Sequence, residues 1–181
     1  MLQRLVLALA ESKNEAADDL LLEALRLGSE QEQAIALDGL MRRQSTRGLS
    51  GVIGQFDSLP EPLRLEILAR IKVFHHSLRE CGRSDQTDLR LAAMKLIAIG
   101  RQGKLAYVLS ENLHDLDENL SKAATEAMVA LARWISTETR ALQKSGIGCQ
   151  VSGIGEENGE SPPEPRNPNP DPRISPRPTK R

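Results

Sequence analysis

The chain contains an internal repeat, and this feature most limits the folds open to it. Residues 89–100 read LRLAAMKLIAIG, and residues 120–131, which begin 31 positions later, read LSKAATEAMVAL. In both segments apolar or small residues occupy the first position and then positions +3, +4, +7, +8 and +11. This spacing places one apolar stripe on a helix of 3.6 residues per turn. A single helical hairpin leaves such a stripe uncovered, so several hairpins must stack to make a core.

Two further segments fit the same register less closely. The four segments begin at positions 32, 63, 89 and 120, which are 31, 26 and 31 residues apart. An apolar helical segment precedes each of the four repeated segments. These preceding segments span 16–27, 49–56, 73–80 and 105–113. No sustained alternation of apolar and polar residues indicates a strand. The sequence therefore predicts an all-α protein, an α-α superhelix of about four helical hairpins over residues 16–136.

Both ends of such a solenoid need a polar cap. We expect residues 1–10 to form a first helix, because their apolar stretch is shorter than the roughly 7–15 residues of a signal peptide. On this interpretation the protein is cytoplasmic. Residues 137–144 are expected to form a separate last helix that caps the other end. If the caps fail, the ends would favour self-association, and the sequence leaves the oligomeric state open.

Composition changes sharply after residue 144. Glycine is frequent over residues 145–155, and eight of the ten prolines lie between positions 162 and 178. Such a segment buries too little apolar surface to offset the entropy lost on ordering. We therefore predict a repeat domain over residues 1–144 and a disordered, proline-rich tail over residues 145–181. Pro165 and Pro168 in the tail make a P-x-x-P motif, which is a weak candidate ligand for an aromatic-lined groove.

The two C-terminal copies of the repeat resemble a known family. Residues 115–128, an aspartate-containing turn followed by an alanine-rich helix, and residues 88–100 resemble the short HEAT-type repeats of bacterial and phycobilisome-lyase-like proteins. The resemblance covers about residues 16–136 and implies a solenoid with a concave binding face. Ser121 and Gln33 stand where the family has arginine, so a ladder of Asp–Arg pairs between repeats is expected to be incomplete.

Charge and aromatic content argue against several classes of function. The chain has 24 Lys and Arg against 25 Asp and Glu, so no excess positive charge is available to neutralise phosphates. Phe56, Phe74, Tyr107 and Trp134 are too few to form a base-stacking platform. No apolar run reaches the roughly 18 residues that a membrane span needs. We therefore expect neither a nucleic-acid nor a membrane partner.

No group of residues predicts a catalytic, cofactor or metal site. His75 and His76 are neighbours, and neighbours on a helix point about 100° apart, so the two side chains cannot bind one metal ion together. Cys81 precedes a glycine and has no fixed histidine partner to activate it. Asp18 and Asp19 lie near the start of a predicted helix, where carboxylates favour the positive end of the helix dipole. An enzyme is therefore the less favoured interpretation.

The predicted function is a protein-interaction scaffold or regulatory module that binds its partner through the concave face. Nine residues point away from the predicted core in the repeat register and form the expected partner-binding strip: Met41, Leu65, Lys72, Leu91, Lys95, Lys122, Glu126, Val129 and Arg133. Alternating apolar and charged residues suit a protein or helix ligand.

The alternative is a HEAT-like enzyme related to bilin lyases or to DNA glycosylases. A bilin lyase needs aromatic and polar groups around a tetrapyrrole, and four aromatic residues are few for this purpose. A glycosylase needs a basic concave face. Residues 1–144 hold 20 acidic and 19 basic side chains, so only a local cluster such as Arg42, Arg43 and Arg47 offers one.

Overall fold

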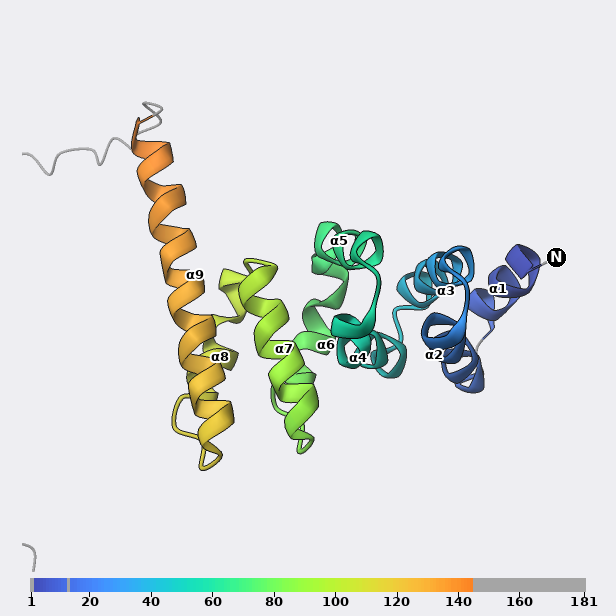
Figure 1. The fold of residues 1–181 in the computed structure, drawn as a ribbon, viewed down its shortest axis with the longest axis horizontal. Coiled ribbons are helices and arrows are strands. Elements are labelled where there is room, and N and C mark those ends of the chain that lie inside the picture. Colours follow the sequence, from blue (N-terminus) through green and yellow to red (C-terminus); the bar gives the residue numbers. More distant parts are fainter. Residues whose placement is uncertain (1, 13, 145–181) are drawn as a thin grey trace, which may run out of the picture. The chain divides into compact units, whose positions relative to one another are not determined.

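The computed structural model describes residues 2–12 and 14–144, and this part of the chain is helical and contains no β-strand (Figure 1). The predicted all-α class is therefore confirmed. The α-helices are α1 (Leu2–Glu11), α2 (Ala16–Leu27), α3 (Glu30–Arg43), α4 (Thr46–Gln55), α5 (Glu61–Ala69), α6 (His75–Cys81), α7 (Thr87–Ile99), α8 (Ala106–Asn112) and α9 (Glu118–Lys144). Short 3₁₀ helices are η1 (Phe56–Ser58), η2 (Ile71–Phe74) and η3 (Gly103–Leu105). The predicted tail, residues 145–181, lies outside the described residues.

Local signals in the sequence set several helix boundaries. The carboxylate of Glu32 accepts a hydrogen bond from the backbone N–H of Ser29 at 2.8 Å and so stabilises the start of α3. Pro62 lies in the first turn of α5, where the missing N–H of proline costs no helical hydrogen bond. The carboxylate of Asp117 accepts a hydrogen bond from the N–H of Asn119 at 2.9 Å and so caps the start of α9.

The two repeated segments form α7 and α9, and their apolar stripes face the core. Ala93 and Ile97 on α7 are fully buried, as are Ala124 and Leu131 on α9. These four residues occupy positions of the repeat register that the sequence assigns to the apolar stripe. The register of the two C-terminal copies is therefore confirmed.

The expectation of a separate last helix is wrong. Residues 118–144 form a single helix of 27 residues. No glycine or proline occurs between Leu131 and residue 137, so nothing interrupts the backbone hydrogen bonds there. Trp134 is the last residue of α9 that packs on the core, and residues 135–141 are exposed. The C-terminal part of α9 accordingly extends past α7 and α8 (Figure 1).

The helices pack in chain order. α1 contacts α2 and α3, α2 contacts α3 and α4, α4 contacts α6 and α7, and α7 and α8 both contact α9. One continuous cluster of buried side chains runs through these contacts from Val6 to Leu131 and includes both phenylalanines, Phe56 and Phe74. Each helix is therefore held mainly by helices close to it in sequence.

Candidate partner-binding groove

A hollow of about 410 Å³ lies between α7 and α9. Its lining consists of small or apolar residues with one charged residue from each helix: Leu91, Lys95, Ala98 and Ile99 from α7, and Ala123, Glu126, Ala127 and Ala130 from α9. Alanine side chains on the α9 side occupy little volume and so leave room between the two helices. We call this hollow the α7–α9 groove; it brings together three residues of the predicted strip, Leu91, Lys95 and Glu126.

The groove combines apolar surface with charges of opposite sign. Ile99 is 46 % exposed, and Leu91 is half-buried against the core. Lys95 and Glu126 are both exposed. The ammonium group of Lys95 also lies 2.6 Å from a carboxylate oxygen of Asp57, which ties α7 to η1. A ligand in the groove would therefore meet an apolar surface flanked by a cation and an anion.

The C-terminal end of α7 is fixed against α9 and η2. The guanidinium carbon of Arg101 lies 5.7 Å from the centre of the Trp134 ring on α9, a distance at which the cation and the ring attract each other. Gly100 allows the end of α7 to lie close to η2, because a Cβ atom at this position would come within 2.8 Å of Cγ1 of Ile71. Trp134 packs against the core as well as against this arginine.

The N-terminal half of α7 is fixed by a polar cluster around Arg90. This guanidinium donates to the side-chain oxygen of Asn112 at 3.0 Å and pairs with the carboxylate of Asp115. Asn112 is buried, and its side-chain nitrogen donates to the backbone oxygen of Val108 at 2.7 Å. The N–H of Asp117 and the guanidinium of Arg90 both lower the pKa of Asp115. The cluster therefore joins α7, α8 and the loop before α9.

The other predicted strip residues do not line the α7–α9 groove. Met41 is buried, with only 4 % of its surface exposed, so the prediction that it faces away from the core is wrong. The reason is that α3 packs against α1, α2 and α4, so more than one side of this helix is covered. Leu65 on α5 and Lys72 in η2 are exposed, as predicted, but they lie on elements earlier in the chain than α7 and α9.

Three predicted residues lie elsewhere on α9. Val129 and Arg133 line a second, shallower hollow of about 550 Å³ together with Ala132, Ser136, Thr137 and Arg140. Lys122 is exposed on the same helix. The predicted strip is therefore not one surface. Its residues lie in several places, and the α7–α9 groove contains more of them than any other surface.

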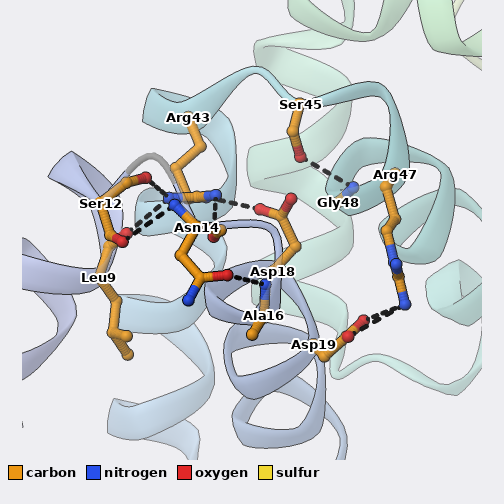
Figure 2. Close-up of polar contacts among 10 residues, drawn as sticks. All are labelled: Leu9, Ser12, Asn14, Ala16, Asp18, Asp19, Arg43, Ser45, Arg47 and Gly48. Atoms are coloured by element: carbon orange, nitrogen blue, oxygen red, sulfur yellow. Dashed lines mark hydrogen bonds and ion pairs between the residues drawn. The ribbon is translucent and has the colours of Figure 1, made fainter.

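Figure 2 shows a polar cluster that the sequence analysis did not find. The Nε of Arg43 on α3 lies 2.5 Å from a carboxylate oxygen of Asp18 on α2, and both side chains are almost fully buried. The same guanidinium donates to the backbone oxygens of Leu9 at 2.7 Å, of Asn14 at 3.0 Å and of Ser12. Arg43 therefore holds the α1–α2 connection against α3.

The arginine run considered for a basic face is paired with carboxylates. The Nε atom of Arg42 lies 2.7 Å from Oδ2 of Asp38. The Nη2 atom of Arg47 lies 2.8 Å from Oδ1 of Asp19 (Figure 2). Together with the Arg43–Asp18 pair, these contacts neutralise all three arginines of the run within the chain. The three arginines therefore form structural ion pairs and offer little excess positive charge to a ligand.

The remaining candidate side chains have local partners. The Cys81 thiol is buried and donates to the hydroxyl of Ser50 at 3.2 Å. Burial raises the pKa of Cys81, which keeps the thiol protonated and weakly nucleophilic. His76 contacts Arg79 through Nδ1 at 3.2 Å. Within residues 2–12 and 14–144, no three His, Cys, Asp or Glu side chains are grouped so that they could hold a metal ion.

Among the described helices, none combines the length and the apolar character that a membrane crossing requires. In comparisons with known proteins, the chain matches no family model, no curated protein and no solved structure.

Proposed function

We propose that this chain is a HEAT-type helical-repeat protein that binds a partner protein through the α7–α9 groove and has no catalytic role of its own. The observation that carries the proposal is the groove itself, which gathers an exposed Ile99, a half-buried Leu91 and two charged side chains between α7 and α9. The two best copies of the repeat supply its two walls.

The shape of the groove favours a helix as the bound element. Side chains on one helix form ridges that fit into the grooves between ridges of another, with axes about 8–10 Å apart. The alanines at positions 123, 127 and 130 lower the α9 wall and so make room for larger side chains of a partner. An amphipathic helix would place its apolar residues at i, i+3, i+4 and i+7 against these alanines and Ile99.

Apolar burial would supply most of the affinity, and the two charges would set the orientation. Covering Ile99 and Leu91 contributes about 25 cal/mol for each Å² removed from water. Lys95 and Glu126 lie on opposite walls of the groove and carry opposite charges. A partner helix with a basic residue toward Glu126 on α9 would fit, whereas Lys95 is already paired with Asp57 and would contribute less to the orientation.

The experiment compares two substitutions of exposed alanines on α9. Ala130→Glu places a charged side chain inside the α7–α9 groove, whereas Ala132→Glu places the same side chain on another side of the helix. Wild-type, Ala130→Glu and Ala132→Glu chains are immobilised, exposed to nuclease-treated lysate of the cells that express the chain, and washed. Bound proteins are then quantified by mass spectrometry.

The proposal predicts a protein that wild type and Ala132→Glu retain equally and that Ala130→Glu loses by more than about tenfold, which corresponds to at least about 1.4 kcal/mol. Circular dichroism of the three chains controls for folding. Equal retention by all three chains would contradict binding in the groove, and recovery of only nuclease-sensitive material would contradict a protein partner.

A further inference from the structure

Three exposed arginines surround the C-terminal part of α9. Arg133 and Arg140 lie on the helix itself, two turns apart, so they share one face and are separated by about 10 Å along the axis. Arg101 follows α7, and its guanidinium carbon lies 5.7 Å from the ring centre of Trp134. We call these three arginines, Arg101, Arg133 and Arg140, the basic end of α9.

The positive charge of the basic end is not neutralised within the described part of the chain. None of the three arginines has a carboxylate within ion-pair distance there, whereas the exposed Arg47 is paired with Asp19. After Glu126, the described residues of α9 include one further carboxylate, that of Glu138. It lies about 140° around the helix from Arg133 and therefore on another side. The basic end thus offers uncompensated cations to a ligand.

An apolar side chain accompanies the arginines. Val129 is 44 % exposed and lies about one turn before Arg133 on the same face. Both residues line the hollow of about 550 Å³, whose other described lining residues include no carboxylate and are Ala132, Ser136, Thr137 and Arg140. A guanidinium group binds a carboxylate through two parallel hydrogen bonds. The surface therefore suits a peptide segment that carries carboxylates beside an apolar residue.

Other occupants fit this surface less well. A second copy packed face to face would bring the same arginines against each other, and like charges repel. Residues 145–181 carry five acidic and five basic side chains, so this segment has no excess negative charge to supply. A nucleic acid would meet a chain with 24 Lys and Arg against 25 Asp and Glu, which gives its phosphates no overall attraction. Charge complementarity therefore favours an acidic segment of another protein.

We propose that the basic end of α9 binds an acidic peptide segment of a partner protein, whose carboxylates pair with the arginines while an apolar side chain contacts Val129. Exposed ion pairs of this kind contribute little individually and weaken as salt screens them. The contact is therefore weak, dependent on salt and specific for negative charge. It uses none of the residues that line the α7–α9 groove, so the failure of one proposal leaves the other standing.

Fluorescence anisotropy of a labelled synthetic peptide, titrated with the full chain, tests the proposal. The peptide repeats Glu-Glu-Leu over about 12 residues, which is long enough to span both arginines of α9. A second peptide has glutamine in place of every glutamate. The test variant combines Arg133→Gln with Arg140→Gln. The matched control combines Arg26→Gln with Arg47→Gln, which removes the same charge from two exposed arginines that are paired with Glu23 and Asp19.

Wild type should bind the acidic peptide, and the test variant should bind it at least about fivefold more weakly. The matched control should change the affinity by less than about twofold, because its arginines lie outside the basic end. The glutamine peptide should bind wild type at least about fivefold more weakly than the acidic one. Raising the salt from about 50 to about 300 mM should weaken binding of the acidic peptide.

Four results would overturn the proposal. The first is no binding of the acidic peptide to wild type, and the second is equal affinity for the acidic and the glutamine peptide. The third is equal affinity of the test variant and the matched control, with helical content unchanged by circular dichroism. The fourth is tighter binding of a labelled oligothymidine of about 20 nucleotides than of the acidic peptide, which would identify a nucleic acid as the occupant.

Discussion

The guanidinium of Arg43 on α3 and the carboxylate of Asp18 on α2 form a buried ion pair with 2.5 Å between Nε and Oδ1. The pair is completed by backbone oxygens of Leu9, Ser12 and Asn14, so the positive charge is surrounded by acceptors (Figure 2). Removing one partner of such a pair leaves the other charge buried without compensation. Arg43 thereby makes the α1–α2 connection dependent on α3.

We predict that Arg43→Ala lowers the free energy of unfolding by about 3–5 kcal/mol, because Asp18 and the carbonyl oxygens lose their donor. Arg47→Ala is the control, since the Arg47–Asp19 pair is exposed and should contribute less than about 1 kcal/mol. Urea titrations followed by far-UV circular dichroism measure both losses. Equal losses for the two variants would show that the buried cluster has no special role.

The Arg90–Asp115 pair predicts a pH dependence. The N–H of Asp117 and the guanidinium of Arg90 lower the pKa of Asp115 in the folded chain. Its contribution to stability is therefore complete above the pKa of an unfolded aspartate, about 3.9, and disappears as the pH falls through the lower folded value. We expect the difference in unfolding free energy between wild type and Asp115→Asn to be constant from about pH 5 to 7 and to shrink below about pH 4. A difference that stays the same down to pH 3 would contradict this assignment.

Gln44 ends α3 in the left-handed region, with φ 50° and ψ 26°. A side chain with a Cβ atom is strained there by about 1–2 kcal/mol, and glycine is not. Gln44→Gly should therefore raise the melting temperature. The free energy of unfolding should increase by about 0.5–1 kcal/mol, once the added flexibility of the unfolded chain is counted. Gln44→Ala keeps the Cβ atom and should give no gain. Calorimetry on both variants separates relief of backbone strain from loss of the glutamine side chain.

Helix α9 should show two levels of protection against hydrogen exchange. Leu120, Ala124 and Leu131 bury the first part of this helix against the core, whereas residues 135–141 are exposed. Exposed helix ends open with less free-energy cost than buried segments do. Amides of residues 122–132 are expected to exchange at least about tenfold more slowly than amides of residues 137–141, as measured by mass spectrometry. Uniform exchange along the helix would contradict the packing described for it.

The periodic apolar residues of the sequence were sufficient to predict α7, the first part of α9 and the side of each that is buried. Ala93 and Ala124 occupy equivalent places in the two copies, and both lie in the core. Met41 was assigned wrongly because the copy that begins at position 32 is loose and α3 is covered on more than one side. One apolar stripe in the repeat register does not predict which residues are buried in a helix that packs against three others.

The groove was predictable only in part. Leu91, Lys95 and Glu126 follow from the repeat register, but Ala123 and Ala127 appear in it as ordinary core positions. Whether an alanine is enclosed or borders a hollow depends on the volume of its neighbours on another helix, and the sequence does not reveal this. Similarly, the partner of Arg43 lies 25 positions earlier in the chain, on a helix whose orientation only the fold determines.

The central claim is that the α7–α9 groove binds a partner protein, and photo-crosslinking tests it most directly. A photoreactive amino acid replaces Ile99, which lines the groove, or Leu116, which is fully exposed in the loop before α9. Each full-length chain is irradiated in the cells that express it, and crosslinked proteins are identified by mass spectrometry. The account predicts a protein adduct at position 99 that is absent at position 116. No adduct at position 99, or the same adducts at both positions, would contradict the claim.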